Sequence, residues 1–301
     1  MFIPRNIQTF LVINYWNFQL YLFGAMKIEY LFHRFKLGLH NKWWLLNYKF
    51  REILIKLQFY WLLYQGSQLL NINYKSVIVF SPHQDDEALG CGGMIALKRK
   101  QGIPIKVIFV TDGGGSHHGN TKITRSKIVQ IRKEEALAAL KILGVESIDI
   151  HFLDKCDGAL SKMTEAEQQQ TIEEMAQLLS SFQPQEVYVT HKQDRSPDHE
   201  ITYQLVKAAI DKAEVKVELW QYAIWLLWKS LLFSNLKFDE LVGAHRVAIH
   251  QVRSQKKQAI ETYRSQYLPI DAESSAVLPP GFLWRFFLPY EVFFKSDSGQ
   301  E

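Results

Sequence analysis

The 301-residue sequence predicts an α/β fold, namely a Rossmann-like, mainly parallel sheet with helices on both faces. Three observations support this prediction. From residue 76 onward, short apolar runs alternate with longer helix-like segments. Glycines end two of the helix-like segments, and polar loops follow directly after three of the apolar runs. We expect two parts: a helical extension rich in aromatic and basic residues over 1–75, and a folded domain over 76–301 that includes a C-terminal helix and tail.

The apolar runs have the composition of buried strands. SVIVF (76–80) and KVIFVT (106–111) are rich in β-branched residues, which favour strands. Similar runs recur further along the chain. We expect these further strands at residues 147–153, 186–191 and 215–225.

The segments between the strands carry helix signals. Residues 88–102 end at Gly102, and residues 124–144, which are rich in Lys, Glu, Ala and Leu, end at Gly144. Because helices thus connect consecutive strands, the strands are expected to run parallel.

Three further helices are expected in the second half of the chain. A Gln/Glu-rich helix should cover about 164–182, and another should run from Pro197 to Ala213. Residues 245–267 have the pattern of an amphipathic basic helix. We expect the aromatic tail that follows to fold back over the core, since so many aromatic side chains would not stay in water.

The N-terminal quarter differs in composition from the rest. Residues 1–75 hold nine Lys/Arg against two Asp/Glu, whereas the remaining residues hold 26 against 29. The same quarter contains 19 of the 40 aromatic residues. Residues 10–26 are 17 residues without a charge, at the lower limit for a membrane-spanning helix, and are interrupted by polar side chains. They lack a clean cleavage site for a signal peptide, and Met26 is an alternative start.

Residues 41–64 look helical, with apolar side chains at three-to-four-residue spacing and basic residues between them. Two interpretations stay open. The helix lies in a membrane interface, which suits aromatic and basic residues, or it covers the domain or a partner subunit. No nucleic-acid-binding motif is present, so we expect no nucleic acid partner.

The two cysteines, Cys91 and Cys156, are too few for a disulfide framework and fit a reducing compartment. We therefore expect a cytoplasmic protein, with a peripheral position at the membrane as the further option that residues 1–75 raise. The oligomeric state stays open.

The stretch SPHQDDEALGCGG (81–93) follows the first strand and places His83, Asp85, Asp86 and Glu87 together. Unpaired buried carboxylates are costly, so this cluster needs solvent or a cation. His199 lies on another loop that the predicted topology brings to the same rim of the sheet. A hydrolytic zinc site needs three such ligands and an open position for water. A solvated helix N-terminus would explain the two later acids, but not the pairing with a distant histidine.

These residues resemble the PIG-L/LmbE-like family of zinc-dependent N-acetylglucosaminyl deacetylases. The first family motif, Pro-His-Pro-Asp-Asp-Glu followed by Leu-Gly-Cys-Gly-Gly, matches PHQDDEALGCGG (82–93) except at Gln84. The resemblance extends through the Thr-Asp-Gly loop at 111–113 and the Pro-Asp-His at 197–199, and covers about 76–267.

The resemblance implies roles for individual residues. His83, Asp86 and His199 would hold one Zn²⁺ per chain, and Asp85 would be the general base. It also implies that Arg132 and Asp157 bind sugar hydroxyls or nearby polar groups. Asp198 would orient a ligand imidazole.

One position departs from the family pattern. Ser196 replaces a histidine that helps to stabilise the oxyanion in many relatives, and a lost donor of this kind can cost roughly 10²–10³ in rate. Arg195 and His191 are near candidates to replace it. We interpret Asp194 and Arg195 as no more than an ion pair within the loop, and Gln84 as a mild change that ligates nothing.

The expected activity is removal of an acetyl group from an N-acetylated amino sugar, in a sugar-containing small molecule or a glycolipid. Two alternatives stay open. One is a metal-binding, non-hydrolytic protein recruited to a membrane through residues 1–75. The other is a zinc hydrolase that acts on a different acyl-amide.

Overall fold

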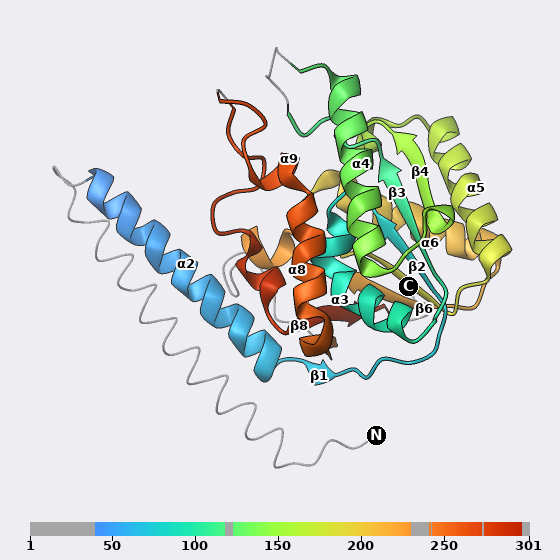
Figure 1. Cartoon of the computed structure of the whole chain (residues 1–301), viewed down its shortest axis with the longest axis horizontal. Helices are drawn as coiled ribbons and strands as arrows, with labels where there is room; N and C mark the ends of the chain where they lie inside the picture. The colour runs from blue at the N-terminus through green and yellow to red at the C-terminus, as the bar shows by residue number, and fades with distance from the viewer. Residues whose placement is uncertain (1–39, 118–122, 230–240, 242, 273, 297–301) are drawn as a thin grey trace. The chain divides into compact units, whose positions relative to one another are not determined.

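The computed structural model describes residues 40–117, 123–229, 241, 243–272 and 274–296 (Figure 1). The chain separates into two compact units, residues 1–54 and 55–301. The apolar segment 10–26 singled out in the sequence lies outside the described residues. Within the described ranges, every helix is too short or too polar to pass through a bilayer.

An eight-stranded sheet organises the second unit, in the order β1-β7-β8-β6-β5-β2-β3-β4. All neighbouring strands pair in parallel except at β8, which is antiparallel to both β6 and β7. The predicted α/β class and mainly parallel sheet are confirmed. The strands are β1 (Gln68–Leu69), β2 (Val77–Ser81), β3 (Ile105–Thr111), β4 (Ile150–Lys155), β5 (Glu186–Thr190), β6 (Glu218–Tyr222), β7 (Ala244–Ala248) and β8 (Tyr290–Lys295).

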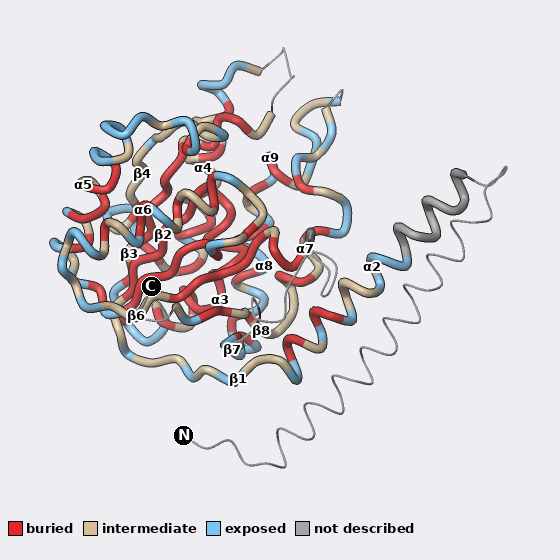
Figure 2. The backbone as a smooth tube through the Cα atoms, turned by 180° about the vertical axis from the view of Figure 1, so that it is seen from behind, coloured by how far each residue is buried: buried red, intermediate tan, exposed pale blue. Residues whose placement is uncertain are grey.

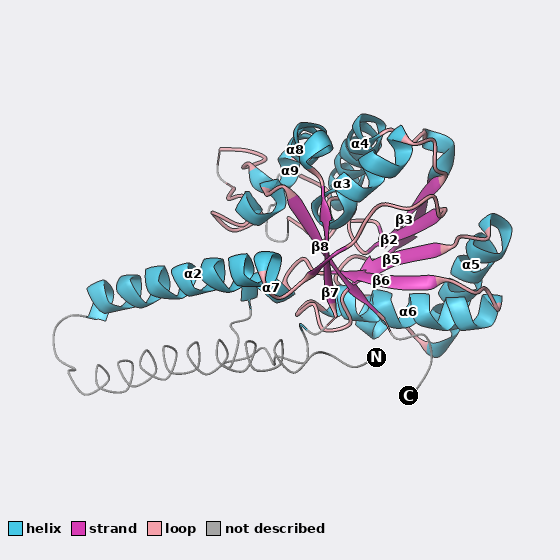
Figure 3. Ribbon diagram, turned by 90° about the horizontal axis from the view of Figure 1, so that it is seen from below, coloured by secondary structure: helices cyan, strands magenta, loops and turns pink. Residues whose placement is uncertain are grey.

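Helices cover both faces of this sheet: α3, α4 and α8 lie on one face, and α5 and α6 on the other (Figure 3). Thr164 begins α5 with a reciprocal capping box, and Gly144 ends α4 in the left-handed conformation, as its position in the sequence predicts. The helices are α2 (His40–Tyr64), α3 (Asp86–Lys100), α4 (Arg125–Leu143), α5 (Glu165–Phe182), α6 (Pro197–Ala213), α7 (Leu226–Lys229), α8 (Arg253–Thr262) and α9 (Arg264–Tyr267), with short 3₁₀ turns at Ser147–Asp149, Leu160–Lys162, His250–Val252 and Leu283–Phe287.

Successive side chains of β2 point to opposite faces of the sheet and so join two separate hydrophobic cores. In β2, Val77 and Val79 join the cluster under α3 and α4, while Ile78 and Phe80 join the cluster under α5 and α6. All five residues of β2 are buried, as Figure 2 shows for the centre of the sheet. A strand buried on both faces explains the unbroken apolar run in the sequence.

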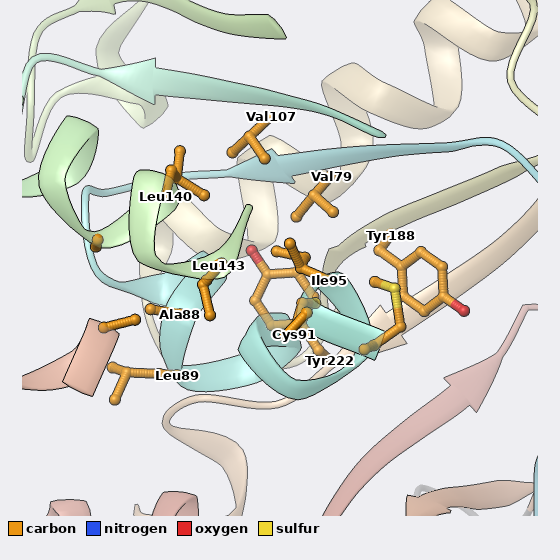
Figure 4. Packing of buried hydrophobic residues seen from close by; sticks show 14 of the residues in the cluster. Val79, Ala88, Leu89, Cys91, Ile95, Val107, Leu140, Leu143, Tyr188 and Tyr222 are labelled. Carbon is orange, nitrogen blue, oxygen red and sulfur yellow. The ribbon is translucent and has the colours of Figure 1, made fainter. Parts of the chain in front are cut away.

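The glycines of GCGG let α3 approach its neighbours closely. A Cβ atom at Gly90 would lie 2.3 Å from the Tyr222 ring, and one at Gly93 would lie 2.5 Å from Ile249. Figure 4 shows Tyr222 in the core that packs around Cys91 and Ile95 of α3. The side chain at position 90 therefore has to be a hydrogen atom for the helix to reach β6.

A buried ion pair joins the C-terminal strand to the same helix. The Glu291 carboxylate accepts hydrogen bonds from the backbone N–H of Gly93 and of Met94, at 2.5 and 2.8 Å. Lys256 Nζ donates to Glu291 and to the Leu89 carbonyl, both at 2.7 Å. The pair thus satisfies backbone groups in the middle of α3, and the C-terminal tail holds the motif helix in place.

The connections reverse direction beside β2. The chain runs from β2 through β3 to β4 on one side, then returns to β5 and β6 on the other. Loops at the carboxyl ends of β2 and β5 diverge at this switch point and leave a crevice for ligands in sheets of this kind. His83 and His199 follow these two strands.

Two expectations for the C-terminal region differ from the structure. The predicted helix over 245–267 is wrong at its start, because residues 244–248 form β7 and α8 begins only at Arg253. Pairing with β1 and β8 decides the conformation there, and local helical periodicity does not. The aromatic tail goes further than folding over the core, since β8 inserts into the sheet between β7 and β6.

Replacing Gly90 by alanine should destabilise the fold by about 1–3 kcal/mol, because the new methyl group overlaps the buried Tyr222 ring. Gly92→Ala is the matched comparison in the same helix and should be less destabilising, since its Cβ would come closest to Lys256 Cγ at 3.2 Å, a much smaller overlap than at Gly90. Urea unfolding of both variants tests this. Equal stability of the two variants would contradict the packing role given to Gly90.

Candidate metal centre

Two loops bring together two imidazoles and a carboxylate. His83 lies in the loop after β2, Asp86 begins α3, and His199 lies in the first turn of α6. The three atoms that face one another are His83 Nδ1, His199 Nε2 and Asp86 Oδ2. His83 Nδ1 lies 3.2 Å from each of the other two, and His199 Nε2 lies 3.3 Å from Asp86 Oδ2. The residues predicted as ligands therefore gather at one point.

Asp194 sets the orientation of His199. Its Oδ2 lies 2.7 Å from His199 Nδ1, so this nitrogen carries the proton and donates it to the carboxylate. Asp194 Oδ1 accepts the backbone N–H groups of residues 224, 225 and 226, at 2.9, 3.0 and 2.9 Å. The buried Arg285 guanidinium donates to the Ile224 carbonyl and so supports the same loop. With Nδ1 occupied, His199 presents a bare lone pair at Nε2.

Two carboxylates orient His83 in the same manner. Its Nε2 lies 3.1 Å from Asp157 Oδ1 and 3.3 Å from Asp198 Oδ2. Asp198 is held in turn by the backbone N–H groups of Gly158 and Leu160, at 2.7 and 3.2 Å. The proton of His83 therefore belongs on Nε2, which leaves the Nδ1 lone pair to face His199 and Asp86.

The surrounding charges favour a cation here. Burial disfavours the charged imidazole of His83, yet hydrogen bonds to Asp157, Asp198 and Asp86 raise its pKa well above the ordinary value. Burial likewise opposes ionisation of Asp157, but the hydrogen bond from His83 lowers the pKa of this carboxyl below its usual range. The site thus stabilises positive charge at its centre, which a metal ion supplies as well as a proton does.

The spacing of the three atoms fits a tetrahedral ion. Bonds of about 2.0–2.1 Å to a tetrahedral zinc ion place the ligand atoms about 3.3–3.4 Å apart. The observed separations of 3.2–3.3 Å match this. The set of His83, Asp157 and Asp198 is also close enough to hold an ion, but protein N–H groups already satisfy its carboxylates. We therefore assign the candidate metal centre to His83, Asp86 and His199.

Asp85, the predicted general base, lies beside this centre in a constrained conformation. Its φ of 149° is unusual for a residue with a side chain, and strain of this kind concentrates at functional sites. Burial raises the pKa of Asp85 to about 7, while the Arg132 guanidinium, 3.2 Å from Asp85 Oδ1, opposes the shift. The charge of Asp85 also interacts with those of His83 and His199.

A buried glutamate holds the backbone of Asp85. Glu87 Oε2 accepts the Asp85 N–H at 3.1 Å, and the Tyr263 hydroxyl donates to Glu87 Oε1. Burial raises the pKa of Glu87 to about 8, partly offset by the hydrogen bond from Tyr263. Glu87 therefore fixes the loop and does not face the three ligand atoms, a role that only its contacts reveal.

Gln84 is more than a mild change from proline. Its fully buried side chain donates from Nε2 to the Thr111 carbonyl at 2.7 Å and so ties the loop after β2 to the end of β3. A Cβ atom at Gly113, whose φ is +67°, would lie 2.1 Å from Gln84 Oε1, so this tie also requires a glycine in the neighbouring loop. Proline could not make this bond.

Arg132 and Asp157 are placed next to the predicted catalytic groups. Arg132 donates to the Gln84 carbonyl at 2.6 Å and to Asp85, whereas Asp157 contacts His83 and accepts the Gly115 N–H at 2.8 Å. Their contact with a substrate stays a prediction. The interpretation of Asp194 as part of a loop ion pair is wrong, because its carboxylate orients His199. Nothing in the sequence distinguishes it from an ordinary loop aspartate.

The position of the expected oxyanion histidine carries a serine without a capping contact. Ser196 precedes α6 in extended conformation, and its side chain makes no hydrogen bond to the helix N-terminus. His191, one candidate replacement, is buried edge-on against Phe294, with ring centroids 5.0 Å apart, and its Nδ1 accepts the Gln193 N–H. Packing therefore accounts for the placement of His191.

Comparison with known sequences places this centre in a family. Residues 78–210 match the family described as PIG-L, GlcNAc-PI de-N-acetylase. The chain is 28% identical over 167 residues to an uncharacterized deacetylase, YaiS, of Escherichia coli K12, covering 54% of this chain and 83% of that protein.

Two other relatives are matched over shorter stretches. A probable N-acetyl-alpha-D-glucosaminyl L-malate deacetylase 2 of Bacillus cereus is 36% identical, over 27% of this chain and 38% of that protein. A 4-oxalmesaconate hydratase of Pseudomonas putida KT2440 is 36% identical, over 27% of this chain and 34% of its own length. The chain thus spans about a third of the length of these two relatives.

Solved structures share the fold. A conserved protein of Thermus thermophilus superposes with a TM-score of 0.53 at 23% identity, covering 73% of this chain and 94% of that protein. A deacetylase of teicoplanin biosynthesis gives a TM-score of 0.55 at 20% identity, covering 74% and 100%. Residues 78–210 thus carry a domain of the PIG-L family, and the solved structures share its fold.

Proposed function

We propose that this chain is a zinc-dependent hydrolase that removes the acetyl group from an N-acetylated amino sugar, releasing acetate and the free amine. One observation carries the proposal: His83, Asp86 and His199 direct three lone pairs at a common point, and Asp85 lies beside it. The family description and the two relatives named as deacetylases support the reaction and the class of substrate.

Two imidazoles and one carboxylate form a donor set of the kind that hydrolytic zinc sites use, so one zinc ion per chain is the proposed cofactor. A bound zinc ion supplies Lewis acidity, which polarises a carbonyl group and makes water a stronger nucleophile at neutral pH. Asp194 and the Asp157–Asp198 pair hold the two imidazoles in the tautomers that such an ion requires.

Asp85 moves the proton in the proposed reaction. It accepts a proton from the attacking water and then donates it to the nitrogen of the departing amine. The Arg132 guanidinium and the Glu87 contact to its backbone hold the carboxylate in one position, and burial keeps bulk water from competing for it.

A second reaction class has a specific observation in its favour. The relative named as a hydratase aligns at 36% identity over 87 residues, and its name describes addition of water without release of an acyl group. A third alternative is a metal-binding but non-hydrolytic protein. Ser196, which stands in place of an oxyanion donor, is the observation that favours it. An assay for released amine separates both alternatives from the proposed deacetylase.

Metal content and activity should depend on different residues of the centre. Asp85→Asn should lower amine release from N-acetylglucosaminides by about 10²–10⁴-fold while keeping bound zinc, because asparagine cannot take the proton. His199→Ala should lose both zinc and activity, as chelation of the wild type should. Elemental analysis and an amine-release assay on each protein test this.

Three outcomes would contradict parts of the proposal. Full activity of Asp85→Asn would remove its role as the base. Wild-type protein without bound metal would overturn the metal centre itself. Bound zinc without amine release from any N-acetylated sugar would favour the hydratase or the non-hydrolytic alternative.

Asp194 should matter for metal affinity although it is not a ligand. Asp194→Asn should weaken zinc binding by about 10–100-fold, since asparagine presents an N–H group that competes with the His199 N–H. Titration with a competing chelator measures the affinity. Asp211→Asn, an exposed change near the end of α6, is the control. An unchanged affinity in Asp194→Asn would show that the carboxylate only supports the loop.

Ser196→His should raise kcat if the reaction lacks an oxyanion donor at this position. A restored donor is worth up to about 10²–10³ in kcat. Ser196→Ala is the control, and its kcat should stay near that of the wild type. A large loss in Ser196→Ala would show instead that the serine hydroxyl already serves the oxyanion.

A further inference from the structure

Exposed apolar side chains of the described residues concentrate in one short segment. Seven of the eleven large apolar side chains that are exposed lie between residues 50 and 74, and the other four are spread over residues 137–277. Scattered exposed apolar residues are ordinary, but a concentration of this kind marks an interaction site. The seven are Phe50, Ile53, Leu57, Tyr60, Tyr64, Leu69 and Tyr74.

Five of them form a stripe along α2. Phe50, Ile53, Leu57, Tyr60 and Tyr64 follow one another at intervals of three and four residues, which keeps them on one side of the helix. Each is 41–54% exposed. We call these five residues the α2 stripe.

The opposite side of α2 is buried near the C-terminal end of the helix. Phe59, Leu62 and Leu63 are at most 5% exposed, and the Phe59 ring packs edge-on against Trp284, 5.5 Å between centroids. Over residues 50–64 the helix is therefore apolar on two sides, and the fold buries only one of them. Figure 2 shows buried and exposed positions alternating along this helix.

Charge around the stripe indicates what kind of surface it meets. Within the sequence of α2, Lys42, Lys49, Arg51 and Lys56 stand against a single acid, Glu52. The three lysines recur every seven residues, so the helix returns these positions to nearly the same side. A second copy of the chain would bring the same positive charge to the interface, which disfavours self-pairing. An anionic surface would be attracted.

Length and composition favour a bilayer surface over a bilayer crossing. Among the described helices none suits a membrane span, and α2 itself carries five charged residues. Tyrosine, phenylalanine and lysine are the residues that helices lying in the membrane interface use. We propose that the α2 stripe docks this protein on the surface of an anionic lipid bilayer, to which the excess of basic residues in the sequence of α2 attracts it. The proposal is independent of the proposed reaction.

Flotation of the full-length chain with lipid vesicles tests the docking. Wild-type protein should float with phosphatidylcholine vesicles that contain phosphatidylglycerol, and much less with phosphatidylcholine alone or at high salt. The variant Leu57→Ser, Tyr60→Ser, Tyr64→Ser should lose flotation. Its control is Leu137→Ser, Ile148→Ser, Leu268→Ser, which removes three exposed apolar side chains elsewhere and should float like the wild type.

A second variant guards against damage to the fold, because Tyr60 and Tyr64 also contact Trp284 and Tyr290. Lys42→Glu, Lys49→Glu keeps every apolar side chain and should lower partitioning onto anionic vesicles by about 25-fold or more, at about fivefold for each lost basic group. Circular dichroism melting checks that each variant is folded.

Several results would overturn the docking. Wild-type protein that fails to float would do so, as would a stripe variant that floats like the wild type. Equal flotation with neutral vesicles at all salt concentrations would contradict the choice of an anionic surface. Light scattering that finds a wild-type dimer, and a monomer for the stripe variant, would show that a second copy covers the stripe instead.

Discussion

Three lone pairs that face one another across 3.2–3.3 Å are the constraint on which the site depends. His83 Nδ1, His199 Nε2 and Asp86 Oδ2 repel unless a cation or a shared proton lies between them. The protein keeps them there because each imidazole is held from behind, His199 by Asp194 and His83 by Asp157 and Asp198. Backbone N–H groups hold those carboxylates in turn. The loops that supply these groups therefore keep the three lone pairs close together against their mutual repulsion. Such preorganisation makes a site selective for a cation before one arrives.

The fold provides this arrangement through a few close contacts. The connections after the paired strands β2 and β5 diverge, and the first turns of α3 and α6 bring Asp86 and His199 together at this point. The glycines of α3 allow the helix to lie against Tyr222, and Glu291 and Lys256 bind its backbone N–H and carbonyl groups from the C-terminal part of the chain. Arg285 supports the loop whose N–H groups bind Asp194. The last fifth of the chain, which carries none of the predicted ligands, therefore determines how well the ligands are held.

The surface of α2 raises a separate question from the chemistry of the crevice. α2 has an apolar stripe on each of two sides, and packing within the fold buries only one of these stripes. The α2 stripe exposes apolar and aromatic side chains to solvent, in a helix whose sequence holds four basic residues against one acid. Under the proposed docking, a substrate carried at a membrane and one free in solution would meet the metal centre at different local concentrations.

The family resemblance supplied the predicted ligands His83, Asp86 and His199, and the sequence by itself determined the α/β class and most strand and helix positions. Local periodicity and one dense polar motif carry that information, since both depend on residues near one another in the chain. The tertiary structure alone decided the strand at 244–248, the place of β8 within the sheet, and the partners of Asp194, Glu87 and Gln84. Each of these depends on a contact between distant segments, with Asp194 meeting residues 224–226 and Tyr263 meeting Glu87. No local pattern encodes such a contact, because the free energy that selects it is gained only once both segments are packed.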